Sequence, residues 1–418
     1  RSKTSAQMTF VVGRRRIGKT SLLTNAFDTN ESLYFFVSKK NEILLCEEFV
    51  EEIKKKLNVP VFGGFPSFVD VFGFLMQVSK TRNVTLIIDE FQDFSIVNSS
   101  IFSEIQHIWD REKTNSKMNL ILCGSIYALM TKIFENAKEP LFGRATQRMH
   151  IKPFSISTLK QIISDYHPKY SNEDLLAFYL FTGGVAKYVE LLVQAKAFTF
   201  EAILDEILGD HSLFLEEGKN VLIDEFGKDY MNYFSILSLI SSGKTSRPEI
   251  ESIMKIDIGG FIERLEKTYG LIKKVRPILA KPNSRSIKYR IEDHYLKFWF
   301  RFIFKFKSAI EIGNYSYVKD LIRRDYATYC GDILERYFTE KLIATKQFNQ
   351  IGAYWERNNQ NEIDIVAIND IEKRVLFVEV KKNPLKIDID TLKAKSTRLL
   401  PQFKDFEIEY QGLSLEDM

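Results

Sequence analysis

The segment from Phe10 to Ser21 constrains the fold of this chain more than any other. It reads Phe-Val-Val-Gly-Arg-Arg-Arg-Ile-Gly-Lys-Thr-Ser, an apolar run followed by the spacing G-x-x-x-x-G-K-T. A loop that wraps a phosphate closely needs backbone N–H groups that point inward, and glycine allows the chain to make that turn. The pattern therefore predicts a nucleoside triphosphate site between a strand at residues 8–12 and a helix that extends to Phe27.

Each residue type in this loop has a physical task. Gly13 and Gly18 let the backbone close around phosphates. Lys19 would reach the β- and γ-phosphates, and Thr20 would direct its hydroxyl to Mg²⁺. A helix that begins at Lys19 would direct its positive dipole end at the anion. The residues expected to bind the nucleotide in this segment are Gly13, Ile17, Gly18, Lys19, Thr20 and Ser21.

Length and composition set the frame for this site. A chain of 418 residues is expected to form two or three domains, each with its own core. No apolar run approaches the roughly 18 residues that span a bilayer, so no membrane partner is expected. Cys46, Cys123 and Cys330 lie far apart in apolar surroundings, which favours a reducing, cytoplasmic location. The chain starts without an initiator methionine, so we expect upstream sequence to be missing.

A second acidic motif follows about 70 residues later. Residues 84–88 form an apolar run that ends in Asp89 and Glu90, the pattern of a buried parallel strand whose carboxyl end meets a ligand. Asp89 would hold Mg²⁺ through water, and Glu90 would polarise the water that attacks the γ-phosphate. The alternative is an ordinary acidic helix N-terminus, which the upstream phosphate-binding loop makes less favourable.

Two further polar residues follow predicted strands. Ser125 ends a buried strand at residues 118–123, and it is a candidate either for sensing the γ-phosphate or for capping a helix at residues 126–134. Arg144 precedes a fifth strand that ends near Ile151. It is a candidate arginine finger, in cis or across a subunit, and the alternative is a solvated loop arginine.

These motifs together resemble the archaeal-type AAA+ ATPases, relatives of the origin-recognition and STAND ATPases. The residues that carry the resemblance are Gly13–Thr20, IIDEFQ at Ile87–Gln92, CGS at Cys123–Ser125, LFGR at Leu141–Arg144 and FTGG at Phe181–Gly184. The resemblance implies ATP and Mg²⁺ as cofactors, a possible homo-oligomer, a helical lid after the ATPase core, and a Ser125 strand between the strands of Lys19 and Asp89. The family's F-x-G-R-E-x-E segment is absent, which leaves the adenine contacts open.

Residues 228–305 read as three helices followed by a β-hairpin, the order of a winged helix. Basic side chains crowd the hairpin, enough to contact several phosphates: Lys273, Lys274, Arg276, Lys281, Arg285, Lys288 and Arg290. DNA is therefore the expected partner, although winged helices also serve as protein docking modules. The aromatic stretch at residues 293–302 is expected to be a packed connector rather than a base-stacking platform.

The last predicted domain, residues 306–418, carries an acid and lysine set. Alternation along residues 374–381 puts Glu379 and Lys381 on one strand face, and Asp364 begins the neighbouring strand. This arrangement resembles the PD-(D/E)XK phosphodiesterase fold. By that resemblance Glu335, Asp364 and Glu379 would gather Mg²⁺, and Lys381 would orient the attacking water. The alternative is an exposed strand without chemistry.

The sequence thus predicts an α/β chain with four parts: a P-loop ATPase core at 1–154, a helical lid at 155–227, a winged helix at 228–305 and a restriction-endonuclease-like domain at 306–418. The leading hypothesis is an ATP-hydrolysing protein that acts on DNA and carries a metal-dependent nuclease domain. The alternatives are a STAND-like signalling switch whose last domain only binds a partner, and an ATP-gated transcriptional regulator.

Overall fold

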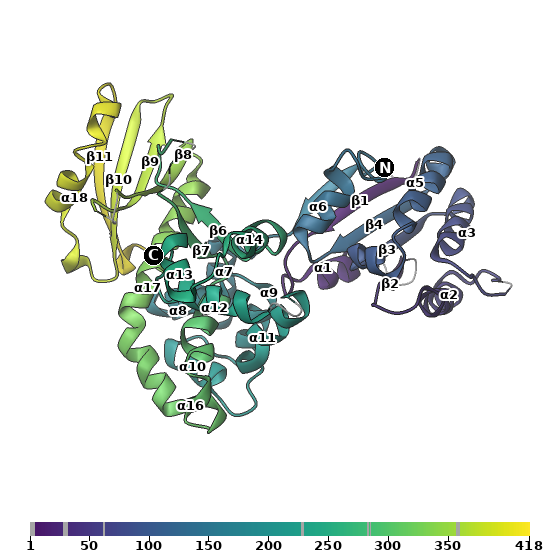
Figure 1. The fold of residues 1–418 in the computed structure, drawn as a ribbon, viewed down its shortest axis with the longest axis horizontal. Helices are drawn as coiled ribbons and strands as arrows, with labels where there is room; N and C mark the ends of the chain where they lie inside the picture. The colour runs from purple at the N-terminus through teal and green to yellow at the C-terminus, as the bar shows by residue number, and fades with distance from the viewer. Residues whose placement is uncertain are drawn as a thin grey trace. The chain divides into compact units, whose positions relative to one another are not determined.

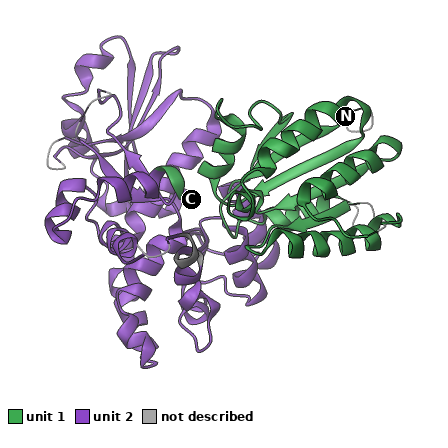
Figure 2. Ribbon diagram, turned by 45° about the vertical axis from the view of Figure 1, so that its right-hand side comes forward, with its two compact units in different colours: residues 1–152, 267–269 green, residues 153–266, 270–418 purple. Residues whose placement is uncertain are grey.

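Two compact units make up the chain. The computed structural model describes residues 5–27, 32–61, 63–226, 230–281, 284, 286–356 and 360–418. Unit 1 is Arg1–Lys152 with Lys267–Tyr269, and unit 2 is Pro153–Glu266 with Gly270–Met418 (Figure 2). Among the described residues, no helix combines the length and the apolar character needed to cross a membrane.

Unit 1 contains a parallel sheet of five strands in the order β2-β3-β4-β1-β5 (Figure 1). The strand that precedes Ser125, β4, lies between the strand of the phosphate-binding loop and the strand of Asp89, as expected. Because parallel strands end at the same edge, the segments after β1, β3 and β4 meet there. The strands are β1 (Gln7–Val12), β2 (Ser32–Phe36), β3 (Val84–Asp89), β4 (Met118–Gly124) and β5 (Gln147–His150).

Helices cover both faces of this sheet. Phe10 and Val12 of β1 belong to the larger core, which the helices α2, α3, α5 and α6 complete. Val11, between them, points to the other face and packs with Leu23 of α1. The two-residue repeat of a strand explains why an unbroken apolar run is needed. The helices are α1 (Lys19–Ala26), α2 (Glu42–Leu57), α3 (Phe68–Thr81), α4 (Phe94–Val97), α5 (Ile101–Glu112) and α6 (Tyr127–Glu135).

Unit 2 begins with a helical segment. Ser171 and Asp174 form a reciprocal capping box at the start of α8, and Gly183 ends that helix with φ of 53°. Gly184 also has a positive φ, and a Cβ there would collide with the Phe154 backbone, so only glycine fits. The helices are α7 (Ile156–Tyr166), α8 (Asn172–Thr182), α9 (Ala186–Gln194), α10 (Phe200–Ile207) and α11 (Leu213–Phe226).

Three helices and a two-stranded antiparallel hairpin follow, as the sequence indicates. They are α12 (Tyr230–Ser241), α13 (Arg247–Met254), α14 (Gly259–Glu263) with the π-helical turn η4 (Arg264–Thr268), β6 (Ile272–Val275) and β7 (Lys288–Ile291). Arg285 lies outside the described residues. The aromatic stretch forms α15 (His294–Phe298) and the π-helical η5 (Trp299–Phe304). Phe298, Trp299 and Phe300 are buried, which agrees with a packed connector.

The chain ends in a second sheet of four strands in the order β11-β10-β9-β8. The β10–β11 pair is parallel and the other two pairs are antiparallel. After α16 (Lys307–Glu311), the elements are α17 (Tyr315–Thr345), β8 (Gln350–Tyr354), β9 (Ile363–Asn369), β10 (Arg374–Lys381), α18 (Ile389–Ser396) and β11 (Glu407–Ser414). Lys382, directly after β10, forms an ion pair of 2.8 Å with Glu173 of α8.

Candidate active sites

The loop after β1 has the geometry that phosphate binding requires. Gly18 has φ of 88°, a left-handed conformation, where it precedes α1. A Cβ on Gly13 would lie 2.9 Å from the carbonyl oxygen of Ile151, so a side chain there would crowd the turn. Lys19 is 7% exposed, and its ammonium donates to the carbonyl oxygens of Gly13 at 2.7 Å and Arg14 at 3.0 Å. The loop therefore holds this cation at its centre.

Asp89 is a meeting point for three donors at the carboxyl end of β3. Its Oδ2 accepts from the Thr20 hydroxyl at 2.8 Å and from the Tyr34 hydroxyl at 2.7 Å. Its Oδ1 accepts from the backbone N–H of Glu90 at 3.0 Å. A hydroxyl and a carboxylate side by side are the hard oxygen ligands that Mg²⁺ prefers. The chemistry of Thr20 and Asp89 thus fits the metal that the motif implies.

Glu90 adopts a left-handed conformation, with φ of 53°, and its carboxylate turns toward β4. Its Oε2 accepts from the Gln92 side chain at 2.6 Å and from the Ser125 hydroxyl at 2.8 Å. The helix-cap alternative for Ser125 is wrong, because α6 is preceded by Ile126 and has no side-chain cap. Ser125 faces Glu90 instead, which puts the two acids, Ser125 and Lys19 at one edge of the sheet.

Arg144 lies elsewhere in the same unit. It donates to the carbonyl oxygen of Phe142 at 2.7 Å and pairs with Asp110 at 3.1 Å. It precedes β5, which runs parallel to β1, so it belongs to the edge where these strands begin. Lys19 follows the opposite edge. The structure therefore does not bring Arg144 to the nucleotide site of its own chain, and an action across a subunit stays a prediction.

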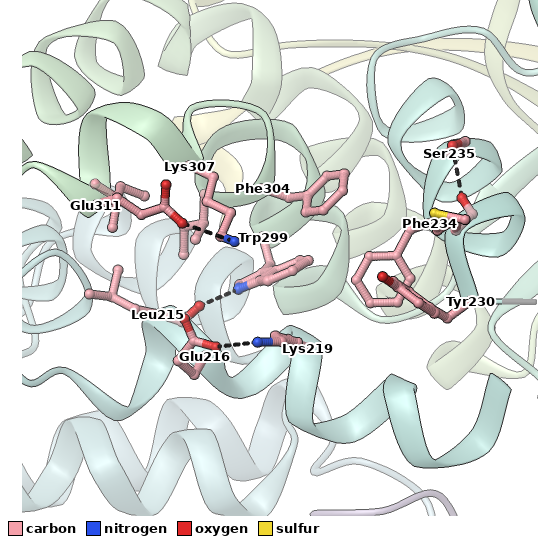
Figure 3. A pocket seen from close by; sticks show the side chains of 13 residues that line it. Leu215, Glu216, Lys219, Tyr230, Phe234, Ser235, Trp299, Phe304, Lys307 and Glu311 are labelled. Atoms are coloured by element: carbon pink, nitrogen blue, oxygen red, sulfur yellow. Dashed lines mark hydrogen bonds and ion pairs between the residues drawn. The ribbon is translucent and has the colours of Figure 1, made fainter. Parts of the chain in front are cut away.

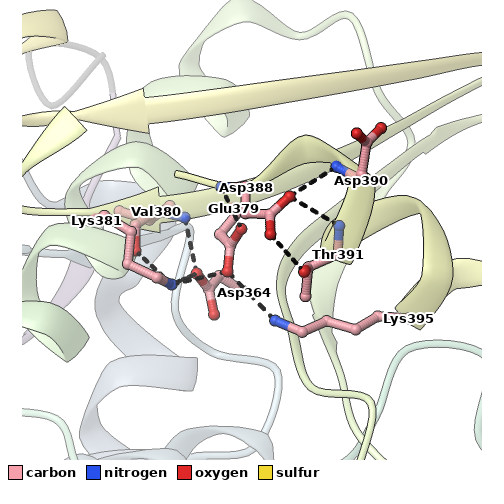
Figure 4. A network of polar contacts seen from close by, with 8 residues as sticks. All are labelled: Asp364, Glu379, Val380, Lys381, Asp388, Asp390, Thr391 and Lys395. Carbon is pink, nitrogen blue, oxygen red and sulfur yellow. Dashed lines mark hydrogen bonds and ion pairs between the residues drawn. The ribbon is translucent and has the colours of Figure 1, made fainter. Parts of the chain in front are cut away.

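The four-stranded sheet of unit 2 brings Asp364, Glu379 and Lys381 together, as the sequence indicated (Figure 4). Lys381 pairs with Glu379 Oε1 at 3.1 Å and with Asp364 Oδ2 at 3.5 Å. Asp364 also accepts from the backbone N–H of Val380 at 2.7 Å. A second cation, Lys395 of α18, approaches Glu379 Oε1 to 3.3 Å. The cluster thus contains two lysines where the sequence suggested one.

The carboxyl groups of this cluster have unequal pKa values. Burial and the charge of Asp364 raise the pKa of Glu335 well above its usual range. Burial also raises the pKa of Asp364, although the hydrogen bond from the Val380 N–H and the charge of Lys381 act to lower it. Burial acts the same way on Glu379, but Lys381 and Lys395 outweigh it and hold the pKa of Glu379 low. Opposed shifts among neighbouring acids are typical of functional sites.

A metal centre is not already assembled from these acids. In the part of the chain that the structure describes, no group of three or more His, Cys, Asp or Glu side chains is arranged to hold a metal ion. Glu379 is engaged by two lysines instead. The carboxylate set of Glu335, Asp364 and Glu379 as Mg²⁺ ligands therefore stays a prediction.

Sequence reasoning missed three residues at these two sites. Tyr34 contacts Asp89, Gln92 contacts Glu90, and Lys395 contacts Glu379. Gln92 had a signal, because it lies two residues after Glu90 within one motif. Tyr34 lies on the edge strand β2 and Lys395 on helix α18. No motif spacing in the sequence connects either residue with the acid that it contacts.

A cavity lies among the helices of unit 2 (Figure 3). This cavity of about 510 Å³ is lined by aromatic side chains that include Tyr230, Phe234, Trp299 and Phe304. The Trp299 indole N–H donates to the Leu215 carbonyl oxygen at 2.8 Å. Two ion pairs also border the cavity, Glu216–Lys219 and Lys307–Glu311. These four charged residues at the cavity thus pair with one another, and the cavity walls are mainly apolar.

Comparisons with known proteins agree with the geometry of unit 1. Residues 2–192 match the family described as an ATPase domain predominantly from Archaea. Residues 299–392 match the family described as Archaea bacterial proteins of unknown function. An uncharacterized protein of Methanocaldococcus jannaschii is 29% identical over 386 residues, which cover 90% of this chain and 83% of that protein.

One solved structure shows a similar fold, and a second is reported with it for comparison. The Walker-type ATPase of Pyrococcus abyssi has a TM-score of 0.54 at 17% identity, and the match covers 70% of this chain and 90% of that one. The ORC2 protein of Aeropyrum pernix, in ADPNP–ADP complexes, has a TM-score of 0.47 at 11% identity and covers 73% of this chain and 88% of that one. The chain thus matches the predominantly archaeal ATPase-domain family over residues 2–192 and a family of unknown function over residues 299–392.

Proposed function

We propose that this protein hydrolyses MgATP in unit 1 and acts on DNA through unit 2, where a metal-dependent site cleaves phosphodiester bonds. The division into an ATPase core, a lid, a winged helix and a nuclease-like domain at residues 154, 227 and 305 belongs to this proposal. The observation that carries the ATPase part is the convergence of Thr20, Asp89 and Glu90 at the sheet edge beside Lys19.

In the nucleotide site the residues divide the work by charge. Lys19 would exchange its two carbonyl partners for oxygens of the β- and γ-phosphates. Thr20 and Asp89 would hold Mg²⁺, which when bound neutralises charge on those phosphates. Once its carboxylate leaves Ser125 and Gln92, Glu90 would accept a proton from the water that attacks the γ-phosphorus, while the bond from that phosphorus to the ADP oxygen breaks. ATP hydrolysis thus requires a movement of one side chain.

The element order of the C-terminal sheet supports the nuclease part. The order α17-β8-β9-β10-α18-β11, with one parallel pair at the β11 edge, is similar to the PD-(D/E)XK fold. Asp364 comes from the start of β9 and Glu379 from the end of β10, so their carboxylates meet. Lys381 would orient a water for attack on phosphorus and stabilise the developing charge while the bond to the leaving nucleotide oxygen breaks.

Positive charge near the hairpin supports DNA as the substrate. Lys273, Arg276 and Lys281 are exposed, and in the described part of the chain they have no ion-pair partner. The hairpin is joined to the last domain, because Ile278 N–H donates to the Ala353 carbonyl oxygen at 2.8 Å. Lys288 of β7 also pairs with Glu362 at 2.7 Å. A phosphate backbone bound by the hairpin would therefore lie on the same unit as the acid cluster.

A signalling switch remains the second candidate, and one observation favours it. Glu379 is satisfied by Lys381 and Lys395, which is how a structural ion-pair network in a binding module is arranged. Under this proposal the protein hydrolyses ATP slowly, and its last domain binds a partner without cutting DNA.

The deciding experiment measures DNA cleavage and ATP hydrolysis in the same samples. Plasmid and single-stranded DNA are incubated with Mg²⁺ or Mn²⁺, with and without ATP, for the parent, Glu379→Ala and Lys381→Ala. Lys393→Ala is the matched control, because Lys393 lies on α18 and pairs with Asp390 rather than with Glu379. We expect cleavage by the parent and the control, and none by the other two variants. Hydrolysis of ATP without any cleavage would favour the switch.

A further inference from the structure

Tyr34 extends from β2 to the acid of the neighbouring strand. The register pairs Tyr34 with Ile87 and Phe36 with Asp89, so Asp89 lies two residues further along β3. The Tyr34 hydroxyl covers this offset and donates to Asp89 Oδ2 at 2.7 Å. This is the same oxygen that accepts from Thr20 at 2.8 Å. One oxygen of Asp89 therefore accepts hydrogen bonds from hydroxyl groups of two other elements.

Asp89 depends on such donors because it is only 4% exposed. Among the described residues it forms no ion pair, and its oxygens accept from the hydroxyls of Thr20 and Tyr34 and from the N–H of Glu90. A buried carboxylate without enough donors would turn or take up a proton. Outer partners of this kind fix the orientation of a metal ligand, and their loss weakens metal binding.

We propose that Tyr34 is a positioning residue of the magnesium site: its hydroxyl holds the Asp89 carboxylate where Asp89 and Thr20 together present oxygens to the cation of MgATP. The inference rests on the proposed ATP hydrolysis. Burial and the hydrogen bond to Asp89 raise the pKa of Tyr34, so its hydroxyl stays a donor throughout the neutral range.

The ring and the hydroxyl of Tyr34 have separate tasks, which makes the idea testable. The ring packs against the smaller core of unit 1, which includes Val11, Leu23 and Ile121. Tyr34→Phe keeps this packing and removes only the donor to Asp89. The variant is therefore expected to fold as the parent does, which urea unfolding in EDTA verifies.

The test measures metal binding directly rather than turnover. Mn²⁺ is titrated into the protein with saturating ADP and followed by electron paramagnetic resonance, and a fluorescent ADP analogue is titrated separately in EDTA. For Tyr34→Phe we expect the Mn²⁺ dissociation constant to rise roughly ten-fold or more. The affinity for the analogue without metal is expected to stay at the parent value.

Tyr127→Phe is the matched control, since the Tyr127 hydroxyl accepts from Arg148 in the same unit and does not contact Asp89. It should leave the Mn²⁺ constant unchanged. An unchanged constant in Tyr34→Phe would overturn the proposal. A parent protein that binds neither nucleotide nor Mn²⁺ with nucleotide would instead contradict the proposed ATP hydrolysis, so the two failures are distinguishable.

Discussion

The hydroxyl of Ser125 donates to Oε2 of Glu90 at 2.8 Å, and this contact connects the end of β4 with the acid that follows β3. Gln92 donates to the same oxygen at 2.6 Å. An oxygen that already accepts two hydrogen bonds is a poor base, because its lone pairs are engaged. The contact therefore engages Oε2 of Glu90, and this oxygen can take a proton from water only after the donors separate from it.

Glu90→Gln is expected to bind ATP and to stall hydrolysis. The amide keeps the size of the side chain but cannot take a proton from water, so kcat should fall by about 100-fold or more. Steady-state hydrolysis and equilibrium binding of ATP measure the two properties. Glu48→Gln, on an exposed part of α2, is the control. Full turnover by Glu90→Gln would exclude Glu90 as the base.

Lys19→Ala is expected to abolish nucleotide binding. The ammonium is the cation held by the Gly13 and Arg14 carbonyls, and without it the loop loses the buried charge at its centre that would match the phosphates. Calorimetric titration with ATP measures the effect, and Lys54→Ala, whose lysine pairs with Glu51, is the control. An ATP affinity equal to that of the parent would contradict the assignment of this loop.

Lys395→Met is expected to shift the acid limb of DNA cleavage to higher pH. Lys395 and Lys381 hold the pKa of Glu379 low against burial, so removing one cation raises that pKa. Glu379 is then ionised only at higher pH, and activity that needs its carboxylate is lost earlier as the pH falls. A pH–rate profile measures the shift, with Lys393→Met as the control. A profile identical to that of the parent would mean that Lys395 does not act on Glu379.

His294 is expected to make unit 2 sensitive to mild acid. It is 5% exposed, and burial lowers its pKa to about 3. The unfolded state takes up this proton below about pH 6.5 while the folded state does not, so stability is present above pH 6.5 and is lost as the pH falls.

His294→Asn keeps a donor near the Tyr179 carbonyl oxygen and removes the titration. Between pH 7.5 and pH 5 its free energy of unfolding should fall by about 2 kcal/mol less than that of the parent. Urea unfolding at the two pH values measures this, and the exposed His211→Asn is the control. An equal loss in the parent and His294→Asn would contradict the burial argument.

Gly218→Ala is expected to destabilise the protein, because an added Cβ would lie no more than 2.7 Å from three atoms of the Trp299 ring. Such overpacking costs about 1–3 kcal/mol. Gly331→Ala is the matched helical control, since a Cβ there meets nothing within 4 Å. It should be neutral or stabilising by up to about 1 kcal/mol. Urea unfolding followed by tryptophan fluorescence compares the two, and equal stabilities would contradict the close packing.

The nucleotide site was readable because its main groups lie in short, continuous motifs. The glycines of the loop, Lys19 and Thr20 fall within eight residues, and Asp89 and Glu90 are consecutive. The phosphate-binding loop and the two acids lie at the same edge because their strands belong to one parallel sheet, and the apolar pattern of those strands already predicts such a sheet. The role of Ser125 was open, since a hydroxyl before a helix reads as a cap, and only the extended Ile126 backbone separates it from α6.

The strands of the C-terminal domain were harder to predict from the sequence, because two of them are not buried on both faces. Strand β8 is an edge strand of partly exposed residues, and β11 alternates acids with other side chains near the surface, so neither has an apolar run. Helix α17 extends over 31 residues, and the helical spacing of its buried residues Val318, Ile322, Tyr326 and Cys330 begins well before the Gly331–Glu335 segment that the motif search singled out. Lys395 approaches Glu379 only because α18 packs against β10, which is a tertiary property.

Lys381 and Lys382 are consecutive, and they attach β10 to two different parts of unit 2. Lys381 binds the acids Asp364 and Glu379, while Lys382 binds Glu173 at the first turn of α8. The contacts with the acid cluster and with the helix are therefore only one residue apart along the chain. Replacing Lys382 would therefore remove a contact with α8 and leave both acid contacts of Lys381 in place.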